Sequence, residues 1–214
     1  MPKGTFNNLA IEKQEKIMRT AIDEFLNKGY QKGNIGSIAK NAGIAKGSIY
    51  QYFENKKELF LFCISWASKI LLKKYGNFSG FKEKKMNLFD YIYESAEATW
   101  FQLKEERELI IFIQNTFIGK YGSITEEATK NMIEVSNNYT LNLIKDGKKQ
   151  GYIRDDIDDD LILMFMTGAS LKIKEYLFKK NNALGMNILD EEYEEYKKHS
   201  KAMIELLKNG MGAK

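Results

Sequence analysis

The chain has 214 residues, 43% of them hydrophobic, and a formal net charge of +4 at pH 7. This length accommodates one large domain, or a small domain followed by a larger one. Pro2 is the one proline, so helix breakers are absent from residue 3 onward and an almost entirely helical protein is expected. The charge is too small to indicate nucleic-acid binding by itself. No apolar run approaches the roughly 20 residues that span a membrane.

The cysteine content and the N-terminal sequence indicate the compartment. Cys63 is the one cysteine and cannot form an internal disulfide, which suits a reducing environment. The first 16 residues, MPKGTFNNLAIEKQEK, lack the apolar core of a signal peptide. We therefore expect a soluble, cytoplasmic protein without a membrane partner.

Apolar residues recur at helical spacing from Ile11 to Leu26, which predicts a first long helix that ends near Gly29. Lys13, Lys16 and Arg19 on its other side are interpreted as a solvated face, with contacts to phosphate as the alternative. This helix is expected to lie across the back of the two short helices that follow.

Residues 34 to 58, NIGSIAKNAGIAKGSIYQYFENKKE, predict two short helices joined by a tight turn at Gly43. Asn34 is expected to cap the first of them, and Gly43 to take the left-handed conformation that ends it. The second carries hydrogen-bond donors outward and an apolar anchor, Ile49, inward, as a helix that reads a DNA major groove does. A plain helical hairpin in an all-helical protein gives the same pattern.

The run AGIAKGSIYQYFENKKEL, residues 42 to 59, resembles the signature of the TetR family of bacterial regulators. That signature includes Lys-Gly-Ser/Thr, an aliphatic residue, Tyr, a variable residue and Tyr-Phe. Ala45 and Lys57 depart from the residues that are commonest at their positions. The resemblance covers the chain to residue 60 or so and implies a sequence-specific, DNA-binding transcriptional regulator.

The DNA contacts are predicted to divide between bases and phosphates. Lys46, Ser48 and Gln51 are predicted to face base edges, because lysine can donate to guanine and glutamine can pair with adenine. Gly47 is expected to let the backbone approach the DNA closely. The predicted phosphate contacts are Asn34, Ser37, Tyr50, Tyr52 and Lys56.

Helical patterns continue along the rest of the chain. Asn55 and Glu58 form a capping box that starts a long helix from Leu59 to about Tyr75. Further helices are predicted at about 86–104, 107–119, 124–149, 158–180 and 191–208.

These elements predict an all-α fold of about nine helices. Residues 1–54 are expected to form a three-helix, helix-turn-helix DNA-binding domain. Residues 55–214 are expected to form a helical domain for effector binding and dimerisation.

Aromatic residues are dense between residues 86 and 118, a pattern that is also typical of a plain core. Similar regulators of the TetR family bind small, usually apolar effectors among these helices. Tyr93, Glu97 and Trp100 share one helical face, so Glu97 is hypothesised to favour a cationic, lipophilic effector, although a solvated glutamate fits the same spacing. The predicted effector-binding residues are Trp66, Ile70, Tyr93, Glu97, Trp100, Phe101, Phe112 and Phe117.

The last two helices are expected to form a homodimer interface, as the resemblance implies. A twofold dimer would present two recognition helices to successive major grooves, roughly 34–36 Å apart, on a near-palindromic operator. The alternative is that these helices only cover their own domain. The predicted interface residues are Leu161, Phe165, Gly168, Leu171, Met203 and Leu206.

No catalytic constellation can be assembled from the sequence. His199 is the one histidine, and Cys63 has no histidine near it in sequence. Neither a phosphate-binding loop nor a cluster of metal ligands is recognisable, so no enzyme activity, cofactor or metal is predicted. The preferred interpretation is a repressor that a small lipophilic effector releases from its operator. The alternatives are a regulator controlled by a protein partner, without a small-molecule effector, and a helical enzyme or carrier.

Overall fold

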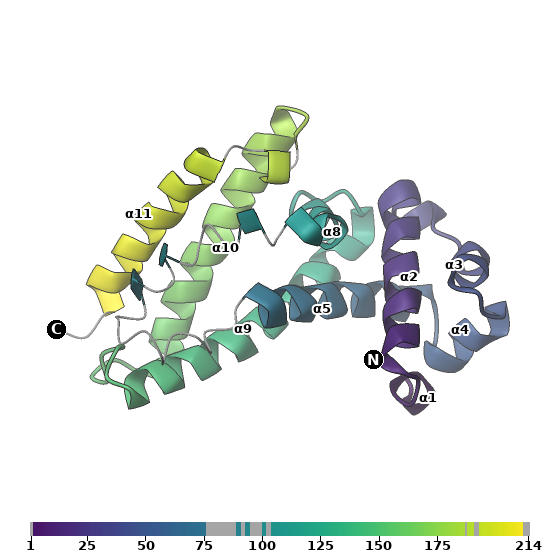
Figure 1. The fold of residues 1–214 in the computed structure, drawn as a ribbon, viewed down its shortest axis with the longest axis horizontal. Coiled ribbons are helices and arrows are strands. Elements are labelled where there is room, and N and C mark those ends of the chain that lie inside the picture. Colours follow the sequence, from purple (N-terminus) through teal and green to yellow (C-terminus); the bar gives the residue numbers. More distant parts are fainter. Residues whose placement is uncertain are drawn as a thin grey trace. The chain divides into compact units, whose positions relative to one another are not determined.

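The structure is a computed structural model in which most of the described residues are helical (Figure 1). Among them are nine α-helices and no β-strand, which confirms the predicted all-α fold. In this described part, no helix is both long and apolar enough to cross a membrane. The described residues are 2–75, 89–90, 93–94, 100–101, 104–186, 188–190 and 193–211.

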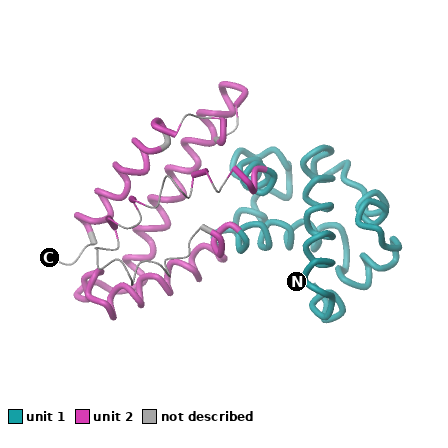
Figure 2. Tube along the Cα trace, viewed as in Figure 1, with its two compact units in different colours: residues 1–70, 108–133 teal, residues 71–107, 134–214 magenta. Residues whose placement is uncertain are grey.

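The chain divides into two compact units (Figure 2). The first unit combines residues 1–70 with residues 108–133, and the second combines residues 71–107 with residues 134–214. The first unit is therefore assembled from two stretches that are far apart in the sequence. The functional boundary expected at residue 54 stays a prediction, because compactness does not define function.

The first unit begins with α1 (Gly4–Asn7) and α2 (Ile11–Lys32). Helices α3 (Ile35–Ala42) and α4 (Lys46–Tyr52) follow and lie together on one side of α2 (Figure 1). On the predicted apolar face of α2, Ile17, Ala21, Ile22 and Phe25 are buried, whereas Ile11 at its start is 76% exposed and Leu26 is half-buried. The helix bends at Gly29, where φ is 69°.

Helix α5 (Lys56–Tyr75) continues the chain, and the first unit is completed by α8 (Arg107–Phe117), the 3₁₀ turn Gly122–Ile124 and the start of α9 (Thr125–Lys149). The predicted cap of α5 is confirmed, because the Glu58 backbone N–H donates to Asn55 Oδ1 at 2.9 Å.

The second unit contains α10 (Asp159–Ala183), the 3₁₀ turn Ile188–Asp190 and α11 (Tyr193–Met211). Asp158 caps α10 by accepting a hydrogen bond from the Asp160 backbone N–H at 2.8 Å. Most of the helix predicted at 86–104 lies outside the described residues. The core of this unit is built on five buried side chains: Phe89, Ile144, Ile153, Ile162 and Ile204.

Candidate functional site

Helix α3 starts at a side-chain cap. Asn34 Oδ1 accepts hydrogen bonds from the backbone N–H groups of Gly36, at 2.7 Å, and Ser37, at 3.2 Å. The predicted cap at Asn34 is therefore confirmed. The capping oxygen is occupied by helix amides, whereas the amide nitrogen of Asn34 has no hydrogen-bond partner among the described residues, which leaves it able to donate to a phosphate.

A buried carboxylate fixes the place where α3 begins. Glu24 is 5% exposed and accepts a hydrogen bond from the Asn34 backbone N–H at 3.0 Å. It also pairs with Lys28 at 3.0 Å, so its charge is compensated. Glu24 is not among the residues predicted from the sequence. The available signal was a glutamate between Ile22 and Phe25, on the apolar side of the predicted helix.

The turn between α3 and α4 has the predicted left-handed glycine. Gly43 has φ 74° and ψ 34°, a conformation that other residues adopt only with strain. Its N–H donates to Lys40 O at 3.1 Å, and the N–H of Ile44 donates to Ala39 O at 2.9 Å. These two bonds satisfy the last carbonyls of α3 and set the direction in which α4 departs.

Helix α4 turns its polar side chains outward. The side chains of Lys46 and Gln51 form no hydrogen bond or ion pair with any described residue, so both are free to bind a partner. Ile49, 1% exposed, holds the opposite side of the helix in the core. The residues that were predicted to read bases or to approach the DNA are exposed or half-buried: Lys46, Gly47, Ser48 and Gln51.

The predicted phosphate contacts differ in their surroundings. Asn34 and Tyr50 are exposed, and Ser37 is half-buried. Tyr52 is only 7% exposed, and its ring stands edge-on to Phe6, with centroids 5.9 Å apart. The ring of Tyr52 thus belongs to the core. Its contact with phosphate stays a prediction.

Lys56 holds the end of α2. Its ammonium donates to Gln31 O at 2.9 Å and to Gly33 O at 3.2 Å, and it lies 5.0 Å from the centroid of the Tyr30 ring. A cation at these carbonyls also complements the negative end of the helix dipole. Lys56 is thus a structural clamp, and its predicted phosphate contact stays a prediction.

Replacing Lys56 by methionine is expected to lower the free energy of unfolding by about 1 to 2 kcal/mol, because two carbonyls lose a charged donor. Urea denaturation measures this change. The matched control is Lys46→Met, in which a lysine without an internal partner is replaced. It is expected to change stability by less than about 0.5 kcal/mol. Equal losses in both variants would show that the clamp contributes nothing.

The residues predicted to bind an effector are divided between the two units. Phe112 is fully buried in the first unit, where its ring centroid lies 5.5 Å from Phe60 and 5.4 Å from Tyr121. Glu97 lies outside the described residues. Trp66, Ile70, Phe112 and Phe117 belong to the first unit, and Tyr93, Trp100 and Phe101 to the second.

The three described rings of the predicted effector set in the second unit already have cations above them. Lys104 Nζ lies 5.6 Å from the centroid of Trp100 and 6.0 Å from that of Phe101. Lys201 Nζ lies 5.7 Å from the centroid of Tyr93. A cationic effector at these rings would therefore compete with ammonium groups of the chain itself.

The first unit also buries polar groups that the sequence analysis did not single out. The buried hydroxyls of Ser68 and Thr125 have no hydrogen-bond partner within the described residues, whereas the side chains of Asn115 and Tyr121 lie beside each other and interact. Burial raises the pKa of Tyr121 well above its usual value, so this hydroxyl stays protonated and can donate. Unpaired buried polar atoms are costly, and such atoms are frequently satisfied by water or by a ligand.

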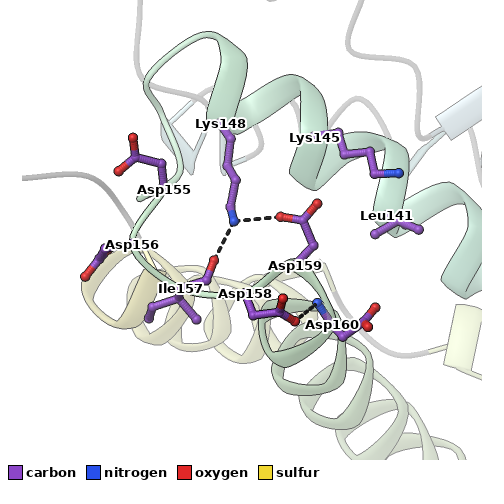
Figure 3. Close-up of a pocket in the computed structure, with 9 residues that line it drawn as sticks. All are labelled: Leu141, Lys145, Lys148, Asp155, Asp156, Ile157, Asp158, Asp159 and Asp160. Atoms are coloured by element: carbon purple, nitrogen blue, oxygen red, sulfur yellow. Dashed lines mark hydrogen bonds and ion pairs between the residues drawn. The ribbon is translucent and has the colours of Figure 1, made fainter.

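A hollow of about 560 Å³ lies in the second unit, between the end of α9 and the start of α10 (Figure 3). Five aspartates line it, and Lys148 ties their loop to α9 by donating to Ile157 O, at 2.5 Å, and to Asp159, at 2.6 Å. No residue of the predicted effector set lines this hollow. Asp158, which caps α10, and Asp159, which pairs with Lys148, hold the corner between the two helices.

The predicted dimer residues form an exposed apolar surface on α10 and α11. Leu161 is 56% exposed, Phe165 48% and Leu206 70%, and Gly168 is exposed as well. Leu171 and Met203 are half-buried. Met164, which the sequence analysis did not include, is 61% exposed beside Leu161 and Phe165 on the same helix. Together, these side chains make an apolar stripe of the kind that marks a protein interface.

A capped helix, a left-handed glycine turn and a short helix with free polar side chains form a helix-turn-helix, the motif with which many transcriptional regulators bind DNA. Residues 17–62 match the family described as bacterial regulatory proteins, tetR family. The protein is therefore a transcriptional regulator whose DNA-binding part is that of the TetR family.

Known proteins resemble the chain over most of its length. The HTH-type transcriptional regulator YhgD of Bacillus subtilis is 26% identical over 151 residues, which cover 68% of this chain and 74% of YhgD. A second relative is IcaR of Staphylococcus aureus, the HTH-type negative transcriptional regulator of the biofilm operon icaADBC. It is 28% identical over 169 residues, which cover 74% of this chain and 83% of IcaR. The regulator FadR of Bacillus subtilis, solved in complex with stearoyl-CoA, has the same fold. Its TM-score is 0.59 at 17% identity, over 90% of this chain and 96% of FadR.

Proposed function

We propose that the protein is a repressor that binds a near-palindromic operator as a homodimer and leaves it when a small molecule binds. The observation that carries the proposal is the outward face of α4, where Lys46 and Gln51 have no partner among the described residues. IcaR, a relative over most of the chain, is named a negative regulator, which supports repression. FadR, which shares the fold, was solved with stearoyl-CoA, which supports control by a small molecule.

The proposal is tested by selecting bound sequences from a pool of random duplexes. A dimer with two α4 helices predicts an enriched site with two inverted half-sites, whose centres are roughly one helical turn apart. Enrichment of a single half-site would argue against the dimer. The absence of any enriched sequence would contradict sequence-specific reading by α4.

The change Lys46→Ala is expected to relax the preference for one base pair of each half-site. A lysine that donates to guanine discriminates by about 1 to 3 kcal/mol against the wrong base. Binding to the selected operator should weaken by that amount, while binding to the operator with that base pair changed should hardly weaken. Fluorescence titrations with both duplexes measure the difference.

Lys13→Ala is the matched control, because Lys13 is an exposed lysine of α2 without a partner in the described part of the chain. Loss of this charge should reduce the affinity for both duplexes equally or leave it unchanged. If Lys46→Ala also weakened both duplexes equally, Lys46 would be a phosphate contact and the proposed base reading would be wrong.

The exposed stripe on α10 and α11 supports the homodimer. An apolar surface that contains Leu161, Phe165 and Leu206 can pair with the same surface of a second copy around a twofold axis. Such a dimer gives each operator two readers, so its affinity exceeds that of one reader by a large factor.

The interior of the first unit supports an effector with an apolar body that carries hydrogen-bonding groups. The rings of Phe112 and Tyr121 would contact the apolar part. The unpaired hydroxyls of Ser68 and Thr125 would bond to the polar groups. Binding would release the operator only if the effector has a higher affinity for the state that does not bind DNA.

Titrating the protein–operator complex with lipophilic acids, neutral amphiphiles and lipophilic cations tests this part of the proposal. Release by the acids or neutral compounds is the expected result. Release by the cations alone would instead favour the effector hypothesised around Glu97. If no compound released the operator, control by a protein partner would be the better explanation.

A further inference from the structure

The segment before α2 packs directly on the proposed reading helix. Phe6 of α1 is 1% exposed, and its ring centroid lies 5.9 Å from Tyr52, 5.1 Å from Phe53 and 5.6 Å from Phe62. This anchor brings residues 3 to 5 to the C-terminal end of α4.

Those residues bond to three consecutive carbonyls at the end of α4. Lys3 donates its backbone N–H to Tyr52 O at 2.8 Å and its ammonium to Tyr50 O at 2.9 Å. Thr5 Oγ1 donates to Gln51 O at 2.6 Å. The last carbonyls of a helix have no partner within the helix, so these bonds satisfy groups that would otherwise need water. The ammonium of Lys3 also lies at the negative end of the helix dipole.

Ile49 and Tyr52 anchor α4 in the core, but within the described residues few polar contacts other than those of Lys3 and Thr5 fix its orientation. It has seven residues, a length at which an isolated helix is unstable. Its N-cap is Ala45, whose side chain forms no capping hydrogen bond. The segment of residues 3–6 therefore supplies the polar contacts at the C-terminal end of the helix, opposite the turn at Gly43.

We propose that Lys3, Thr5 and Phe6 are positioning residues that fix the orientation of α4 for reading DNA. This inference rests on the proposed function, because it takes α4 as the reader. The carbonyls that are held belong to Tyr50 and Gln51, whose side chains are predicted to contact phosphate and base. A shift of this end of the helix therefore displaces the side chains of both Tyr50 and Gln51. Residues 3–6 precede the stretch that matches the family, residues 17–62.

The first test compares Thr5→Val with Thr5→Ser. Valine keeps the size of the side chain but cannot donate to Gln51 O, so operator affinity should fall about fivefold, as expected for one lost hydrogen bond. Serine keeps the hydroxyl and should restore the affinity. The matched control is Thr20→Val, which removes a similar hydrogen bond, from Thr20 Oγ1 to Lys16 O at 2.7 Å, inside α2. This control should bind the operator like the unchanged protein.

The second test separates positioning from direct contact with DNA. Lys3→Met should weaken operator binding without changing the salt dependence, because the ammonium bonds to Tyr50 O. If Lys3 instead neutralised a phosphate, the slope of log affinity against log salt would fall by about one. That result would overturn the positioning role of Lys3.

Hydrogen exchange of the full chain without DNA tests, independently of operator binding, whether residues 3–6 hold α4 in place. In Thr5→Val, the amides of α4 should exchange faster, while those of α3 keep their rates, and thermal unfolding should show that the variant is folded. Unchanged exchange of α4, or unchanged operator affinity, would overturn the inference. If the unchanged protein selected no operator but α4 still exchanged faster in Thr5→Val, the proposed function would be wrong. The role of residues 3–6 in holding α4 would still be supported.

Discussion

Replacing Phe60 by alanine is expected to lower the free energy of unfolding of the first unit by about 3 to 5 kcal/mol. The ring is fully buried, and its centroid lies 5.0 Å from those of Phe25, Tyr30 and Tyr121 and 5.5 Å from that of Phe112. The change removes apolar area, leaves a cavity and breaks four aromatic pairs. Two of these partners lie on α2, one lies on α8 and one lies in the segment that follows α8. The side chain of Phe60 therefore connects α2 to residues 108–133.

Urea denaturation, followed by circular dichroism, measures the loss. Phe101→Ala is the matched control, since Phe101 is 55% exposed, and it should cost less than about 1 kcal/mol. Phe60→Leu, which retains more of the volume, should show an intermediate loss and serves if the alanine variant does not fold. An unfolding midpoint of Phe60→Ala equal to that of the unchanged protein would contradict this account of the core.

The double change Leu161→Asp and Phe165→Asp is expected to produce a monomer and to weaken operator binding by about 100-fold or more. Both side chains are about half exposed, at 56% and 48%, so the fold of one chain can tolerate carboxylates there. Within a twofold interface, however, four carboxylates would be buried near one another, which is strongly unfavourable. A monomer contacts the operator with one α4 helix, whereas a dimer uses two. The affinity gained from bivalent binding is then lost.

Sedimentation equilibrium measures the oligomeric state, and titration of the selected operator measures the affinity. The control is Leu184→Asp, because Leu184 is 65% exposed but lies beyond the end of α10, off the apolar stripe. It should remain dimeric and bind the operator normally. A double variant that stayed dimeric with full affinity would exclude this stripe as the interface.

The features predicted correctly from the sequence depend on residues that are close together in the chain. The cap at Asn34, the left-handed turn at Gly43, the cap at Asn55 and the start of α10 after Asp158 each involve residues within a few positions of one another. Local geometry determines such features, so spacing and residue type are enough to recognise them. The all-α fold follows from the same local patterns.

The parts of the site that escaped prediction depend on contacts between distant residues. Thr5 and Gln51 are 46 positions apart, and Lys56 bonds to a carbonyl 25 positions earlier. Lys56 was expected to bind phosphate because its charge opposes the dipole of its own helix. The structure shows that its ammonium bonds to carbonyls at the end of α2, a contact that no local pattern contains, and the phosphate contact stays a prediction. Likewise, the burial of Asn115 depends on how α8 packs, which the spacing of its own residues does not define.

The two-part composition of the first unit has a consequence for synthesis of the protein. The ribosome releases residues 1–70 long before residues 108–133, so the partners of Phe60 in α8 and at Tyr121 are missing while the intervening chain is made. Until residue 133 has emerged, nascent residues 1–70 therefore expose an aromatic surface that chaperones can bind. A truncated product that ends before residue 108 would lack these contacts, and such fragments would compete poorly for the operator with the complete protein.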